Sequence, residues 1–124
     1  MYYSKINISV YGSSAHGSTP HLGKDAIVAA SSFILNAQAI VSRLNNPLKP
    51  LVFTVSGVNG GTQFNIITDL VKMTLIYMPG TKKTLKPLSP VLQQLPKAQP
   101  LHLAVRQKLN LAKCRKTEVR HNEL

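Results

Sequence analysis

The stretch that decides the fold is Gly12-Ser13-Ser14-Ala15-His16-Gly17-Ser18-Thr19-Pro20-His21-Leu22-Gly23-Lys24-Asp25, a loop between a predicted strand and a predicted helix. Residues 5–11 before it alternate polar and apolar side chains, the period of a half-buried strand. After it, apolar residues recur every three or four positions, which indicates an amphipathic helix of Ile27, Ala30, Ile34, Ala37, Val41 and Leu44. Glycines tolerate backbone angles that other residues resist, and small hydroxyl residues can hydrogen-bond locally. The loop can therefore hold His16 outward, although an exposed histidine without a role is the alternative.

A second glycine-containing segment follows the helix. Residues 51–56 are β-branched and aromatic enough for a strand. Asn59-Gly60-Gly61 has the composition of a turn, and residues 69–77 alternate again as the next strand. The order strand, helix, strand, strand is the first two-thirds of a split βαβ, ferredoxin-like unit. We therefore predict an α+β protein, a two-layer ferredoxin-like sandwich that is incomplete: β-α-β-β plus an irregular tail.

Together the two segments resemble the dimerisation, or lid, domain of the two-metal aminoacylase and carboxypeptidase family, which includes bacterial amidohydrolases of the hippurate hydrolase type. The resemblance covers residues 5–73. One departure is Thr68, where the family usually has proline. The matching residues are Gly17, Pro20, His21, Gly23, Asp25, Ala26 and Ile27 around His16, and Gly60, Gly61, Phe64, Asn65 and Ile67 in the second segment.

The resemblance implies roles for particular residues. The histidine that matches His16 stabilises the developing oxyanion, often in the active site of the partner subunit, and such a donor is worth roughly 3 to 4 kcal/mol. The asparagine that matches Asn65 hydrogen-bonds to the substrate. Gly17, Pro20, His21, Gly60 and Gly61 are expected to shape the loops, with His21 capping or bracing the loop ahead of the helix.

The resemblance also implies two divalent metal ions, zinc or similar, in a separate catalytic domain of the parent enzyme. This chain offers no ligand set for them, because its four acidic residues are scattered and His16 and His21 lack carboxylate or cysteine neighbours at ligand spacing. We therefore expect no metal and no cofactor in this chain, and no hydrolysis by the chain alone.

Charge divides the 124 residues into two parts. Residues 1–78 carry five basic and two acidic residues, whereas residues 79–124 carry ten and two, so most of the net charge of +11 lies in the tail. The tail has no aromatic side chain to stack on bases, so nucleic acid is expected to bind only non-specifically. The sequence shows no signal peptide and no apolar run of about 18 to 20 residues, which predicts a cytoplasmic protein without membrane contact.

The tail is predicted to be poorly ordered, because prolines at 79, 87, 90, 96 and 100 interrupt it and only residues 101–113 could form a short helix. The codons that encode residues 78–89 and 92–111, read in one shifted frame, can encode amino-acid sequences that resemble the last helix and the last strand of the family's lid. This pattern predicts a partial lid domain at 1–78 and an out-of-frame tail at 79–124.

The favoured interpretation is thus a fragment, the lid domain of a metal-dependent amidohydrolase acting on N-acyl amino acids or peptides. It would be inactive alone and would self-associate or dock on a full-length relative. Two alternatives are a small basic nucleic-acid-binding protein and a free-standing regulatory domain whose tail has its own use.

Overall fold

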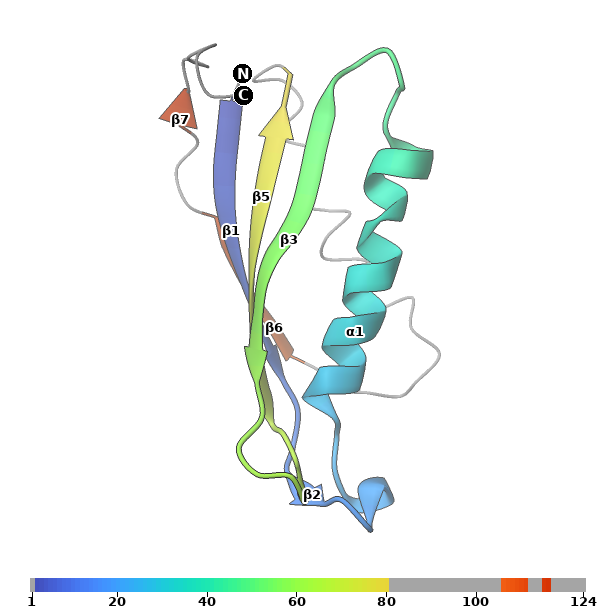
Figure 1. The fold of residues 1–124 in the computed structure, drawn as a ribbon, viewed down its shortest axis with the longest axis vertical. Coiled ribbons are helices and arrows are strands. Elements are labelled where there is room, and N and C mark those ends of the chain that lie inside the picture. The colour runs from blue at the N-terminus through green and yellow to red at the C-terminus, as the bar shows by residue number, and fades with distance from the viewer. Residues whose placement is uncertain (1, 81–105, 112–114, 117–124) are drawn as a thin grey trace.

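The computed structural model describes residues 2–80, 106–111 and 115–116 (Figure 1). The chain combines one α-helix with a mostly antiparallel sheet, which confirms the predicted α+β class. The elements are β1 (Tyr2–Tyr11), β2 (Ala15–His16), the short 3-10 helix η1 (Pro20–Leu22), α1 (Ala26–Ala37), the π-helical turn η2 (Ile40–Leu44), β3 (Leu51–Gly60), β4 (Ile66–Ile67), β5 (Leu70–Pro79), β6 (Arg106–Leu111) and β7 (Arg115–Lys116).

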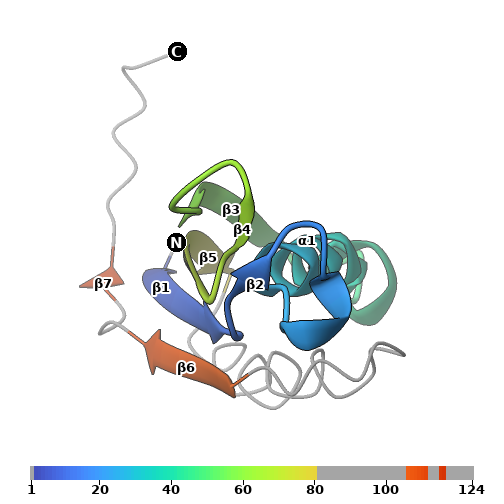
Figure 2. The same ribbon diagram turned by 90° about the horizontal axis from the view of Figure 1, so that it is seen from below.

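The main sheet has the strand order β3-β5-β1-β6, and every neighbouring pair is antiparallel. With the fourth strand on the outer side of β1, this is the strand order of a complete ferredoxin-like sheet. Helix α1 lies along one face of the sheet (Figure 1). A separate pair, β2 and β4, lies beyond one end of the sheet, where Figure 2 shows it beside the turn of η1.

Strand β6 corrects the prediction that the tail supplies no missing element. Residues 106–111 pair with β1 from Ile6↔Leu111 to Tyr11↔Arg106, and β7 extends the cover of β1 at Tyr2 and Tyr3. A short helix over 101–113 is thus wrong for residues 106–111, which are extended. The prediction that residues 79–124 are poorly ordered falls mostly on positions outside the described residues. The position of the second helix of a ferredoxin-like unit lies outside them as well.

The core lies between the sheet and α1, where β1 and β5 contribute alternate residues as their period predicts. Ile6, Ile8 and Val10 face the same layer as Val71, Met73 and Leu75, and all are buried. The helix packs with a different face from the predicted one. Its buried residues are mostly alanines around one large ring, namely Ala26, Ala29, Ala30, Phe33 and Ala37.

The larger aliphatic residues of the helical segment are less buried than the periodicity predicts. Ile27, Val41 and Leu44 are exposed, and only Ala30 and Ala37 of the predicted face are fully buried. Small alanines allow α1 to approach the sheet closely, and Phe33 fills the space between them at zero exposure. The consequence is a helix whose solvent side carries apolar residues.

The helix begins at a well-formed cap. The Asp25 side chain accepts hydrogen bonds from the N–H groups of Ile27 at 2.8 Å and Val28 at 3.1 Å. This satisfies two amides that have no partner within the helix and places a carboxylate at the positive end of the dipole. By length and composition, the stretch Ala26–Leu44 is apolar enough to cross a membrane, contrary to the prediction, although the core helix of a soluble protein meets the same criterion.

Candidate functional site

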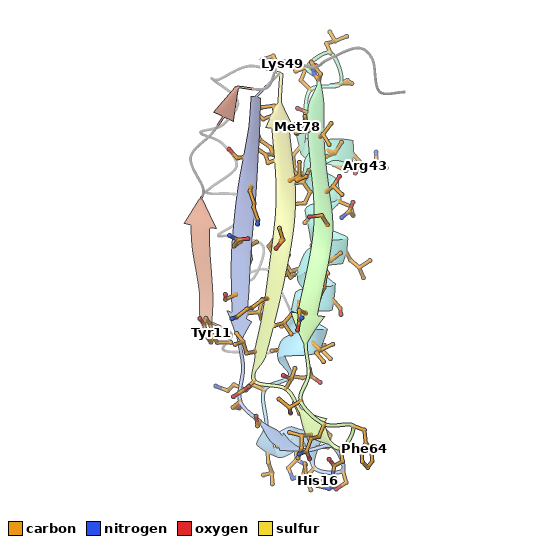
Figure 3. All side chains as sticks on the ribbon, turned by 60° about the vertical axis from the view of Figure 1, so that its left-hand side comes forward. Tyr11, His16, Arg43, Lys49, Phe64 and Met78 are labelled. Atoms are coloured by element: carbon orange, nitrogen blue, oxygen red, sulfur yellow. The ribbon has the colours of Figure 1, made fainter. Side chains whose placement is uncertain are left out.

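Two loops that are far apart in the sequence meet in the β2–β4 pair. Ala15 pairs with Ile67 and His16 with Ile66. Just beyond this ladder, the Gly17 N–H donates to the Asn65 carbonyl oxygen at 2.7 Å. Figure 3 shows His16 and Phe64 together at this end of the molecule, opposite the end that carries Lys49 and Met78. The structure thus brings together the two predicted site segments, and we call this end, residues 12–25 and 61–69, the tip.

Backbone hydrogen bonds within the tip close its base, next to the ends of β1, β5 and α1. Gly12 N–H donates to the Asp69 carbonyl at 2.7 Å, and Ser13 and Lys24 exchange two bonds of 2.9 Å. Gly12 has no room for a side chain, because a Cβ there would overlap the Lys24 carbonyl oxygen. The tip is therefore a braced extension of the fold.

His16 is exposed, and one edge of its ring is fixed by its own loop. The Nδ1 atom lies 2.7 Å from Ser18 Oγ and accepts the Ser18 N–H at 3.2 Å. The Thr19 N–H donates to the His16 carbonyl at 2.9 Å, which closes the turn beneath the ring. Among the described residues, Nε2 has no hydrogen-bond partner. The ring thus keeps its second nitrogen for a group outside this part of the chain.

Asn65 is half-buried, and its side-chain oxygen Oδ1 is buried without a hydrogen-bond partner in the described structure. A buried polar atom of this kind is uncommon in proteins and is costly unless something else satisfies it. Its neighbour Phe64 is fully exposed, although a phenylalanine ring gains much from burial. An unpaired amide oxygen and an uncovered ring therefore lie on consecutive residues.

The remaining predicted site residues lie around the tip. Pro20 and His21 form η1, and His21 is exposed. The residue that caps α1 is Asp25 and not His21. The alternative role of His21, bracing the loop ahead of the helix, stays a prediction. At the end of β3, a Cβ on Gly60 would lie 2.7 Å from Val71 Cγ2, and Gly61 has a φ of 106°, so both positions suit glycine.

No group of three or more His, Cys, Asp or Glu side chains that could hold a metal ion occurs in the described part of the chain. The two acidic residues there are engaged or remote, since Asp25 caps the helix and Asp69 precedes β5. The residues present thus do not fit the two-metal centre implied by the resemblance. What the tip offers chemically is a hydrogen-bonding imidazole, an amide and an aromatic ring.

Sequence reasoning missed Ser18 as a partner of His16 and the exposure of Phe64. A hydroxyl residue two positions after a histidine was a usable signal for the first, because such side chains often bond to nearby groups. No sequence pattern marks the second, since an aromatic residue within an apolar run normally predicts burial.

The chain was compared with known proteins. The family model of the peptidase dimerisation domain matches residues 3–102, further than the resemblance, which ends near residue 73. The chain is 42% identical over 67 residues to the N-acetyl-L-cysteine deacetylase of Bacillus subtilis, covering 54% of this chain and 16% of that protein. It is 37% identical over 84 residues to an N-acetyldiaminopimelate deacetylase of Listeria monocytogenes, covering 68% and 21%.

Solved structures agree. A protein assigned as an aminohydrolase from methicillin resistant Staphylococcus aureus superposes with a TM-score of 0.80 at 31% identity, covering 88% of this chain and 29% of that one. A hydantoinase/carbamoylase family amidase from Burkholderia ambifaria shares the fold with a TM-score of 0.79 at 16% identity, covering 92% and 28%. The chain thus spans about a fifth of the length of the two deacetylases.

Proposed function

The chain belongs to the peptidase dimerisation domain family, and from this premise we propose that it is a self-associating lid unit of an amidohydrolase acting on N-acyl amino acids. The observation that carries the proposal is the Gly17–Asn65 hydrogen bond, which holds the His16 and Asn65 loops side by side at one end of the fold. The chain would be inactive alone and would act on substrate held by a full-length relative.

Self-association is supported by one edge of the sheet and the helix beside it. Among the described strands, β3 lies at an edge of the main sheet, with ten residues and no charge, and an edge strand of this kind readily adds another strand. A shallow pocket of about 150 Å³ between α1 and β3 is lined by Ile27, Ile34 and Val58, among others. Further exposed apolar residues lie on α1, on η2 and on the helix-facing side of β3: Val28, Leu35, Val41, Leu44 and Val58. We call these five residues the β3–α1 surface.

At the tip, the three neighbouring groups suit an N-acyl amino acid. The free nitrogen of His16 can donate to the oxygen that becomes negative when an amide carbonyl is attacked. The half-buried Asn65 side chain can turn its unpaired oxygen outward to accept a substrate N–H, and the Phe64 ring can cover an apolar acyl or side-chain group. The two metal ions and the attacking water belong, in this proposal, to the catalytic domain of the relative.

Complementation would test the proposal. The partner is the Bacillus subtilis N-acetyl-L-cysteine deacetylase with alanine at the position aligned to His16. Adding this chain should raise its hydrolysis of N-acetyl-L-cysteine by about 100-fold, the worth of one oxyanion donor. The same chain carrying His16→Ala should not, and Ser14→Ala in the same loop should act like the unchanged chain. Saturable hydrolysis by the chain alone, or equal rescue by His16→Ala, would refute the proposal.

Self-association can be measured separately by sedimentation. Leu35→Lys places a charge on the β3–α1 surface, where Leu35 is 74% exposed, and should shift the chain toward monomer. Leu48→Lys is the matched control, because Leu48 is 89% exposed but lies in the turn after η2. An unchanged monomer at all concentrations in the parent chain would contradict this part of the proposal.

A further inference from the structure

The loop that carries His16 also contains a residue that selects one of the two neutral tautomers of the His16 ring. A neutral imidazole has one nitrogen that donates and one that accepts, and the partner of one nitrogen decides which form is present. In His16 the decisive contact is from the backbone, because the Ser18 N–H points at Nδ1 at 3.2 Å and can only donate. Nδ1 must therefore be the acceptor.

The Ser18 hydroxyl strengthens the same choice. Its Oγ lies 2.7 Å from Nδ1, and with Nδ1 as an acceptor the hydroxyl hydrogen must point toward the ring. Both donors of one residue thus converge on one nitrogen. If Nδ1 carried a proton, it could not accept the Ser18 N–H, and the hydrogen bond between them would be lost.

We propose that Ser18 is a positioning residue that holds His16 as its Nε2–H form, with that hydrogen directed away from the loop. The rest of the turn keeps the ring in place, since the Thr19 N–H and hydroxyl both donate to the His16 carbonyl. A donor that is oriented before substrate arrives costs no reorganisation during reaction. This inference deepens the proposed function, on which its use in catalysis rests, but the form of the ring is a property of this chain alone.

The two imidazoles of the tip differ in this respect. His21 is exposed in η1, and its side chain has no hydrogen bond among the described residues. Like His16 it is exposed to solvent, but none of the described residues selects its tautomer. His21 is therefore an internal reference for His16.

Nitrogen-15 NMR of the histidine side chains tests the proposal on the full chain, without substrate or partner. At a pH where imidazoles are neutral, His16 should carry its proton on Nε2 and keep Nδ1 bare. Ser18→Ala should lower the ratio of Nε2–H to Nδ1–H by about five-fold, the net worth of one hydrogen bond. Ser18→Thr keeps a hydroxyl and should preserve the ratio, and His21 should stay constant in both variants.

Two results would overturn the proposal. One is a proton on Nδ1 of His16 in the unchanged chain, a measurement that needs no variant to fold. The other is an unchanged His16 ratio in Ser18→Ala when the amide spectrum shows the native fold. Failure of complementation with the predicted NMR result would instead count against the proposed function alone.

Discussion

Gly17 and Asn65 are joined by a 2.7 Å hydrogen bond between the N–H of the first and the carbonyl oxygen of the second. The bond continues the ladder in which His16 faces Ile66, so it sets the distance between the two loops of the tip. A side chain at Gly17 would crowd the same oxygen, since a Cβ there would lie 3.3 Å from it.

We predict that Gly17→Val opens the tip without unfolding the domain. The branched side chain should break the Gly17–Asn65 bond, which is worth about 1 kcal/mol, while the main sheet stays intact. Hydrogen exchange should become faster at the amides of Gly17 and Ile66 and stay unchanged in β5. Ser14→Val, in the same loop, is the control. Equal exchange in the two variants would mean that the bond does not hold the loops together.

Gly60→Ala should destabilise the domain, whereas Gly57→Ala on the same strand should not. A Cβ at Gly60 would lie 2.7 Å from the Val71 side chain and 3.1 Å from the Leu70 carbonyl oxygen. At Gly57 the only neighbour would be Thr74 at 3.8 Å. We expect a loss of about 1 to 3 kcal/mol for Gly60→Ala in urea unfolding and a change within about 0.5 kcal/mol for Gly57→Ala.

Phe33→Ala should be among the most damaging changes in the helix. Its ring has zero exposure among small alanines, so truncation leaves a cavity and should cost about 3 to 5 kcal/mol of unfolding free energy. Leu35→Ala, two positions along the same helix, should change stability by less than about 0.5 kcal/mol in dilute solution. If both variants melted alike, the Phe33 ring would not be the main contact between the helix and the sheet.

Deletion of residues 106–124 should lower the stability of the domain, because it removes β6 and leaves the edge of β1 unpaired. At roughly 1 kcal/mol for each ladder hydrogen bond, the loss should reach several kcal/mol. Deletion of residues 117–124 keeps β6 and β7 and serves as the control. Matching melting temperatures for both truncated chains would show that β6 contributes nothing to folding.

Stability should also fall in strongly alkaline solution. Desolvation by burial raises the pKa of Tyr77 above the ordinary 10.0 of a phenol, and its side chain is 3% exposed. The folded state therefore favours the neutral phenol, and this stability is complete below pH 10 and is lost as the pH rises through the folded-state pKa. The loss can reach about 1.4 kcal/mol per pH unit. Tyr77→Phe should reduce this slope in urea unfolding, and an unchanged slope would contradict the assignment.

Local periodicity was enough to predict β1, α1 and β5, because each buries one side against the same core. The predicted helix face was wrong because a hydrophobic pattern gives large aliphatic residues such as Ile27 and Leu44 more weight than alanines. In the structure Ala26 and Ala29 are buried, and Ile27 and Leu44 are exposed. Small residues are favoured where the helix lies close to the sheet. How close it lies depends on the sheet, whose residues are distant in sequence and do not enter a local pattern.

Strand β6 shows a different limit. Only its second half alternates, with Leu109 and Leu111 paired with the buried Ile8 and Ile6 of β1. The preceding prolines and the basic composition were given more weight, and therefore no strand was predicted there. The strand forms where the free edge of β1 supplies its hydrogen bonds, and a partner of that kind is distant in sequence. The two-residue strands of the tip are likewise too short for any period, so the sequence pattern did not predict that the His16 and Asn65 segments meet.

The two outer edges of the main sheet are unequal, and this limits how many chains can join. Strand β3 offers ten uncharged residues, whereas β6 is six residues long and carries Arg106 and Lys108, which disfavour the addition of another strand. If the chain self-associates through β3, as proposed, each protomer would contribute one pairing edge. Once two such edges had paired, neither protomer would have another to offer, so assembly would stop at a closed dimer and would not continue into a fibre.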